Sequence, residues 1–336
     1  MIYISVLITA YNRKEYLIKA VDSALKQSLN RSYYEIIVIK NFKDDQIDDY
    51  LSYNDIKNII LEGTEGDYIS TGIKESKGKI ISFLDDDDLF DNEKLEYLYD
   101  MFNKYKDLIY LHNAYLEIDD NGNSLDLKPS DVKSNFNDFI INQKDNKSII
   151  FGLKHEADFN LSSISINKSI VNVDYIGRIY HMTDTPLFYL ALSNKGTMYI
   201  SSQKLTKIRF HNSTSRFTID TDQAIIISFR NSEPTKTLNM MNDYFQNYFF
   251  YPIIKCMFYS NKIMKQLIEN QYSNFWKNVL NFSKCVFVIN SKERLAFLIL
   301  YIMSYILKSN KIFIKLYKSK IHNFRKNIKL LNNNQE

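Results

Sequence analysis

Short apolar runs alternate with helical segments over the first third of the chain. Four runs have the length and composition of buried strands: residues 3–8, 35–39, 80–84 and 108–118. Three segments between them predict helices: residues 15–29, 44–51 and 68–76. Residues 61–66 contain two glycines and predict a turn-rich link before the third helix. Strands and helices that alternate at such short connections predict an α/β fold with a parallel sheet and right-handed crossovers.

Polar side chains follow three of these strands at their carboxyl ends. The first strand runs into Thr9-Ala10-Tyr11-Asn12, the second into Lys40-Asn41, and the third into four aspartates. Ligands of α/β proteins bind at this edge of the sheet. The sequence therefore predicts a ligand site where these strands end.

The four aspartates, Asp85 to Asp88, follow residues 80–84 with no glycine or proline between. Neighbouring anions repel one another, and each unit of pKa shift costs about 1.4 kcal/mol, so water or a cation must absorb the charge. Carboxylate oxygens suit Mg²⁺ or Mn²⁺ that carries substrate phosphates. The alternative is an acidic loop that leads to a helix cap at Asp91 or Asn92. The preceding strand and the apolar helical pattern that follows favour the site for a metal and a nucleotide diphosphate.

Composition narrows the class of protein. A length of 336 residues, with 45% hydrophobic and 24% charged residues, predicts a folded chain of about two domains. Cys256 and Cys285 have neither metal-ligand spacing nor the number needed for a disulfide framework, so a reducing compartment is expected. The N-terminus lacks a basic region followed by an apolar run, so we expect no secretory signal and a cytoplasmic location. A net charge of +4 gives no reason to expect nucleic-acid binding.

Four pieces of sequence occur in a characteristic order. They are SVLITAYNR, a helix that ends in KQSL, YEIIVIKN and GIKESKGKIISFLDDDD. Together they resemble the N-terminal half of a family 2 glycosyltransferase. The resemblance implies an inverting reaction and the GT-A fold, which is a Rossmann-like mixed or parallel sheet flanked by helices. It extends to about residue 217, which implies a glycosyltransferase domain over 1–218 and a helical C-terminal region over 219–336.

The resemblance also assigns roles to individual residues. It places five at the nucleotide: Thr9, Tyr11, Asn12, Asn41 and Asp86. It places four at the metal, with Asp87 most direct: Asp85, Asp87, Asp88 and His211. Two positions depart from the pattern, because Lys40 stands where many relatives have an acid and Ile69-Ser70 where an Arg-Asn pair is common. An amide offers both a donor and an acceptor, so Asn41 can still hydrogen-bond a pyrimidine edge.

Asp184 is the candidate catalytic base. It matches the Asp of the family's Glu-Asp pair at the start of a helix, although Thr183 replaces the Glu. An inverting transferase needs a carboxylate to take the proton of the acceptor hydroxyl. The alternative is a helix N-cap, because Asp184 or Thr185 precedes Pro186, and Gly196 would close the helix. The resemblance favours the base.

Two segments further along the chain bear on ligands. Residues 206–216 resemble the family's strand followed by His-x-x-Ser, which places His211 at the diphosphate or the metal; a structural role is the alternative. Residues 308–331 are rich in lysine and arginine, carry no acid, and repeat apolar residues every three or four positions. This basic amphipathic helix suits an anionic membrane surface, or else packs its apolar stripe on the rest of the protein.

The leading hypothesis is an inverting, metal-dependent glycosyltransferase with Mn²⁺ or Mg²⁺. It moves a sugar from a nucleotide diphosphate, with UDP favoured, to a saccharide or lipid-linked acceptor, in the cytoplasm or on the cytoplasmic face of a membrane. A sugar-phosphate nucleotidyltransferase is disfavoured, because residues 9–14 lack the glycine-rich loop of such enzymes. A degenerate, non-catalytic scaffold is the other alternative, suggested by Lys40, Ile69 and Thr183.

Overall fold

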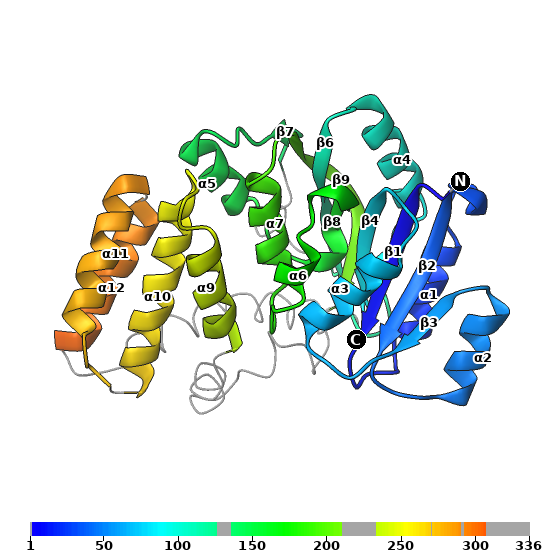
Figure 1. Cartoon of the computed structure of the whole chain (residues 1–336), viewed down its shortest axis with the longest axis horizontal. Helices are drawn as coiled ribbons and strands as arrows, with labels where there is room; N and C mark the ends of the chain where they lie inside the picture. The colour runs from blue at the N-terminus through cyan, green and yellow to red at the C-terminus, as the bar shows by residue number, and fades with distance from the viewer. Residues whose placement is uncertain (1, 126–135, 210–232, 270, 290–291, 307–336) are drawn as a thin grey trace, which may run out of the picture. The chain divides into compact units, whose positions relative to one another are not determined.

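The computed structural model describes residues 2–125, 136–209, 233–269, 271–289 and 292–306. The chain forms two compact units (Figure 1). The sheet unit contains residues 1–124 and 128–210, and the helical unit contains residues 125–127 and 211–336. The domain boundary expected at residue 218 lies outside the described residues.

The sheet unit contains a mixed sheet in the order β3-β2-β1-β4-β8-β6-β9-β5, with β7 paired to β9. Its strands are β1 (Ile4–Ala10), β2 (Tyr34–Lys40), β3 (Lys57–Ile60), β4 (Ile80–Asp85), β5 (Leu89–Phe90), β6 (Leu108–Ile118), β7 (Phe139–Ile140), β8 (Ile164–Asn167) and β9 (Thr197–Arg209). Strands β3, β2, β1 and β4 are parallel, whereas β8 runs antiparallel to both β4 and β6. The predicted α/β class and the carboxyl-end edge shared by β1, β2 and β4 are confirmed.

Helices lie on both faces of this sheet (Figure 1). They are α1 (Leu17–Leu25), α2 (Asp45–Tyr53), α3 (Glu65–Glu75), α4 (Lys94–Lys104), α5 (Asn146–Lys154), α6 (Val173–Ile176) and α7 (Asp184–Leu192). The third helix begins at Glu65, three residues before its predicted start, because Thr64 and Asp67 form a capping box. The last two residues of the predicted link 61–66 are therefore helical.

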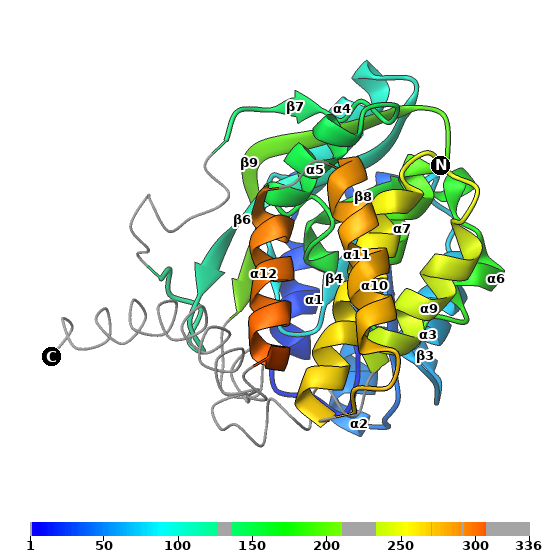
Figure 2. The same cartoon turned by 90° about the vertical axis from the view of Figure 1, so that its left-hand side faces the viewer.

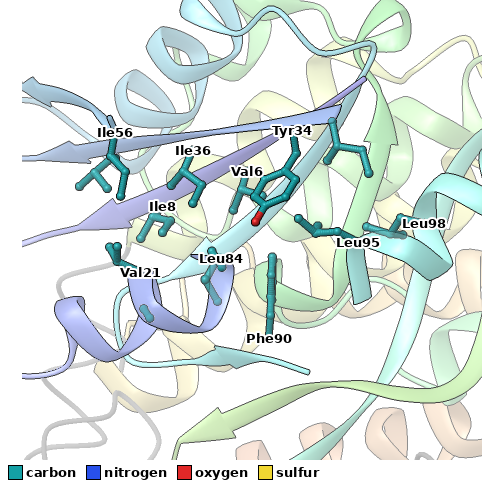
Figure 3. Packing of buried hydrophobic residues seen from close by; sticks show 14 of the residues in the cluster. Val6, Ile8, Val21, Tyr34, Ile36, Ile56, Leu84, Phe90, Leu95 and Leu98 are labelled. Atoms are coloured by element: carbon teal, nitrogen blue, oxygen red, sulfur yellow. The ribbon is translucent and has the colours of Figure 1, made fainter. Parts of the chain in front are cut away.

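One face of the sheet packs against α1, α2 and α4. Alternate residues of the strands, among them Val6, Ile8 and Leu84, meet Val21 of α1 and Leu95 of α4 (Figure 3). These side chains are fully buried. Burial of one such side chain contributes about 1.5–3 kcal/mol, so this layer fixes the strand ends that carry the acidic cluster.

The helical unit has its own core. Helices α9 (Glu233–Tyr244), α10 (Tyr251–Glu269), α11 (Phe275–Ile289) and α12 (Lys292–Ile306) pack side by side (Figure 2). The expected helical C-terminal region is thus confirmed. Within the described residues, no helix has both the length and the hydropathy needed to cross a bilayer. The predicted basic helix over 308–331 lies outside the described residues.

Candidate active site

The ends of β1 and β2 are joined by a pair of amides. The backbone N–H of Asn12 donates to Oδ1 of Asn41 at 2.8 Å, and Nδ2 of Asn41 donates to Oδ1 of Asn12 at 2.8 Å. Asn12 has a positive φ of 54°, which this pairing stabilises. Tyr11 beside it is 61% exposed, and its ring centroid is 6.3 Å from that of Tyr68. Four of the predicted nucleotide residues therefore lie together, since Thr9 belongs to the end of the same strand.

Arg13 holds two of the aspartates. Its guanidinium donates to both carboxylate oxygens of Asp86, with Nε at 3.0 Å, and Nη1 lies 2.9 Å from Oδ2 of Asp87. Burial alone lowers the pKa of Arg13, but these bonds and charges outweigh burial and raise it. Burial raises the pKa of Asp86 to about 6, although Arg13 opposes this rise. This role of Arg13 was not predicted from the sequence, because a lone arginine after a strand carries no distinctive signal.

Asp85 is the least compensated member of the cluster. It ends β4 next to Thr9 of β1, and its backbone amide donates to Oγ of Ser162 at 3.0 Å. Among the described residues, no group donates a hydrogen bond to its carboxylate. Burial, then the charges of Asp88, Asp87 and Glu65, raise its pKa well above the ordinary value. A bound cation would relieve this repulsion.

Asp88 is anchored by the protein itself. Oδ2 accepts hydrogen bonds from Oγ of Ser162 at 2.7 Å and Nδ2 of Asn160 at 3.1 Å, while Oδ1 accepts the backbone N–H of Arg209 at 3.0 Å. Burial, followed by the charge of Asp87, raises its pKa to about 7. These contacts tie the turn after β4 to β9 and to residues 160–162. Its predicted role as a metal ligand stays a prediction, and protein donors already occupy both of its oxygens.

Asp184 begins α7 and is connected to Asp88 of the acidic cluster through Asn160. Its Oδ2 accepts the backbone N–H of Asn160 at 3.2 Å, and the side chain of the same Asn160 donates to Asp88. Its Oδ1 accepts the N–H of Thr185 at 2.8 Å. Burial, then the charge of Glu65, raises the pKa of Asp184 to about 6. The N-cap of α7 is Thr183, without a side-chain cap bond, so Asp184 lies inside the helix rather than at the predicted cap.

Glu65 reaches the same region from α3. Its carboxylate accepts the N–H of Met182 at 3.1 Å, the N–H of Thr183 at 2.9 Å and the Thr183 hydroxyl, and it lies 2.7 Å from Nδ1 of His181. Sequence reasoning missed Glu65, because it lies in the predicted link 61–66 and its partners are more than 110 residues away.

The departures from the family pattern have structural explanations. Lys40 is fully buried, lies 2.7 Å from Oδ1 of Asp48 and donates to the carbonyl of Phe42 at 2.6 Å, so it supports α2. Ile69 is fully buried in α3, and Oγ of Ser70 donates to the carbonyl of Asp67 at 3.1 Å. His211 lies outside the described residues.

The acidic cluster can supply two carboxylate ligands to a metal ion. Within the described part of the chain, no group of three or more His, Cys, Asp or Glu side chains is arranged to hold an ion. Mg²⁺, however, is usually bound by one or two carboxylates together with substrate phosphates and water. Asp85, with its raised pKa, and Asp87 beside it supply this type of donor set.

Part of the chain is similar in sequence to known glycosyltransferases. Residues 5–164 match the family model for glycosyl transferase family 2. An uncharacterized glycosyltransferase of Rickettsia bellii is 34% identical over 128 residues, which is 37% of this chain and 18% of that protein. The poly(ribitol-phosphate) beta-N-acetylglucosaminyltransferase TarP of Staphylococcus aureus is 30% identical over 103 residues, which is 29% of this chain and 32% of that protein.

The fold comparison covers most of the chain. The structure of S. aureus TarS 1–349 in complex with UDP-GlcNAc has a TM-score of 0.52 and 13% identity, and covers 84% of this chain and 90% of that one. The chain spans roughly a fifth to two fifths of the curated relatives with the strongest matches. The matched segment and the sheet topology show that residues 5–164 are similar to the family 2 glycosyltransferases and that the chain has the GT-A fold.

Proposed function

We propose that the protein is an inverting, metal-dependent glycosyltransferase that uses a UDP-sugar and acts on a saccharide or lipid-linked acceptor. The observation that carries this proposal is Asn160, whose backbone binds Asp184 while its side chain binds Asp88. One residue thus joins the candidate base to the acidic cluster. UDP is favoured because TarS, a protein of the same fold, binds UDP-GlcNAc.

Each group in the site has a defined task in this proposal. Asn12 and Asn41 bind the edge of the pyrimidine base, and Arg13 keeps Asp86 and Asp87 in place. Asp85 and Asp87 would hold Mn²⁺ or Mg²⁺, which when bound neutralises the charge of the departing diphosphate.

Asp184 removes the proton of the acceptor hydroxyl. The hydroxyl oxygen forms a bond to the anomeric carbon while the bond to the diphosphate oxygen breaks on the opposite face, so the configuration at that carbon inverts. Burial suits Asp184 to this task, because its pKa of about 6 makes it a stronger base than an ordinary aspartate while leaving it ionised at neutral pH.

A thermal-shift screen tests the donor. UDP-, GDP- and dTDP-sugars would each be added with and without Mn²⁺. A ligand that binds only the folded state at 100 times its Kd stabilises the protein by about 2.7 kcal/mol, so we expect a shift of several degrees for the UDP-sugar with Mn²⁺. A larger shift with GDP-sugars, or equal shifts without metal, would contradict the donor or the metal respectively.

Hydrolysis of the UDP-sugar distinguishes an active transferase from a non-catalytic scaffold. A competent transferase without acceptor is expected to cleave the UDP-sugar slowly in the presence of Mn²⁺, with release of UDP. A protein that gives a thermal shift but releases no UDP, with or without added saccharides, would support a non-catalytic binding subunit.

The helical unit supports a second part of the proposal, contact with an anionic membrane on its cytoplasmic face. Large apolar side chains are exposed along one face of each of two packed helices, α11 and α12: Trp276, Leu280, Phe287, Leu295, Ile299, Met303 and Ile306. Residues 211–336 hold 18 Lys and Arg against 7 Asp and Glu, whereas the remaining residues hold 25 against 32. Apolar side chains combined with a positive charge match an anionic lipid surface.

Vesicle flotation tests this contact. A variant with serine at Trp276, Phe287 and Ile299 is expected to bind phosphatidylglycerol-containing vesicles at least tenfold more weakly, because each buried aromatic or aliphatic side chain contributes more than about 1 kcal/mol. Tyr53→Ser is the control, since Tyr53 is 90% exposed in the sheet unit. Unchanged binding in the triple variant would contradict this surface, and loss of a dimer in that variant would assign the face to a second copy.

A further inference from the structure

The N-terminus of α3 is docked against the segment that leads to Asp184. Gly66 donates its N–H to the carbonyl of Ile179 at 3.1 Å, and the Thr64 hydroxyl donates to the same carbonyl at 3.1 Å. A Cβ added at Gly66 would lie 2.2 Å from the carbonyl oxygen of Ile176 and 2.3 Å from that of Ile179. Helices α3 and α6 lie side by side in both views (Figures 1 and 2). This close approach fixes Glu65 relative to the turn that follows.

Glu65 is the acceptor for that whole turn. Residues His181, Met182 and Thr183 all direct donors at its two oxygens. Met182 has a positive φ of 64°, an uncommon conformation for a residue with a flexible side chain. Hydrogen bonds to a charged acceptor are about twice as strong as neutral ones, so the Glu65 carboxylate offsets the strain of this turn. The next residue in the chain is Asp184.

Glu65 also changes the electrostatic environment of Asp184. Burial alone raises the pKa of Glu65, but hydrogen bonds and charge from His181 and hydrogen bonds from Thr183 hold it below the ordinary value. Glu65 therefore carries a negative charge near Asp184 and raises the pKa of that residue. Two further titratable groups interact with Asp184: His181, which lowers its pKa, and the buried phenol of Tyr110 on β6.

We propose that Glu65 is a positioning residue of the active site, which fixes the turn from His181 to Thr183 and so sets the orientation and the charge environment of Asp184. This inference rests on the proposed function only in taking Asp184 as the base. Thr183, the residue before Asp184, has no carboxylate, and Glu65 of α3 supplies one. The carboxylate comes from a distant part of the chain.

The variant Glu65→Gln tests the role in catalysis. The side-chain amide can accept at one atom only, and its N–H groups face the donors of the turn. We expect kcat to fall about 100-fold, as for a base displaced by about 1 Å, while the KM for the donor changes less than about twofold. The acid limb of the pH profile, which for the native protein reflects deprotonation of Asp184 near its pKa of about 6, is expected to move to lower pH because a negative charge has been removed.

The control carries the same substitution at the other end of the same helix. Glu75 is exposed and pairs with Lys57, so Glu75→Gln should leave kcat, KM and the acid limb unchanged. If Glu65→Gln impairs folding, Thr183→Val is the second variant, because it removes one donor to Glu65 and retains the volume. We expect about a tenfold loss of kcat in Thr183→Val. The variant Thr183→Ser keeps the hydroxyl and should retain most of the native kcat.

Amide hydrogen exchange gives a readout that does not depend on activity. Glu65 accepts the N–H groups of Met182 and Thr183, so both should exchange about tenfold faster in Glu65→Gln and at the native rate in Glu75→Gln. Absence of transferase activity in the native protein would contradict the proposed function. The exchange measurement would still test whether Glu65 holds the turn. Native exchange rates in Glu65→Gln, or a change confined to the donor KM, would overturn the positioning role.

Discussion

The variant Asp184→Asn is expected to abolish sugar transfer and to leave donor binding within about twofold of the native value. Asparagine keeps the shape of the side chain but cannot take the proton of the acceptor hydroxyl. Loss of a general base typically lowers the rate by 10²–10⁴-fold, so kcat should fall by about that factor. Initial rates with acceptor and titration of the donor with Mn²⁺ measure the two quantities separately.

The matched control for this prediction is Asp174→Asn. Asp174 is exposed in α6, in the same unit, and its loss should change neither quantity. Native activity in Asp184→Asn would remove Asp184 from the mechanism. A parallel loss of donor binding would instead mean that Asp184 contacts the donor.

The variant Asp85→Asn is expected to raise the Tm of the metal-free protein and to reduce the stabilisation of the protein by UDP-sugar with Mn²⁺. The raised pKa of Asp85 means that the folded protein disfavours the ionised carboxylate, so this group costs stability above its ordinary pKa and the cost disappears as the pH falls. Neutralising it should therefore raise the Tm of the metal-free protein by a few degrees at pH 7. The same change should nearly eliminate the stabilisation by UDP-sugar with Mn²⁺, because one of the two ligand carboxylates is lost.

Differential scanning calorimetry with and without Mn²⁺ and UDP-sugar checks both directions, and Asp174→Asn again serves as the control. A lower Tm without metal would show that the Asp85 carboxylate makes a stabilising contact. An unchanged shift on addition of metal and nucleotide would exclude Asp85 as a ligand.

The main elements of the sheet unit were predictable because they bury apolar residues at regular spacing. The predicted strand at 108–118 coincides with β6, and β1 and β2 begin within one residue of their predicted starts. The edge strand β3 was missed, since its four residues are only partly buried and carry no apolar run. The start of α3 was missed for a related reason, because a polar capping box rather than an apolar pattern defines it.

The site was predictable where neighbouring residues carry its chemistry. The clustered aspartates and the helix start at Asp184 could be recognised from consecutive residues, and Asn160 shows that they belong together in space. Arg13 and Glu65 could not be identified, because their roles depend on partners 73 and 117 residues away. Such contacts depend on how the strands and helices pack, which the local pattern does not encode.

The mutual amide pair of Asn12 and Asn41 has a consequence for nucleotide selectivity. Asn41 uses both of its side-chain polar atoms on Asn12, on the backbone N–H and on Oδ1. Replacement of either residue alone therefore leaves its partner with an unmet hydrogen bond and loosens the connection between two strands. Retargeting the protein to a different nucleobase thus calls for a coordinated exchange at both positions. Stepwise evolution of base preference should pass through a weakened intermediate.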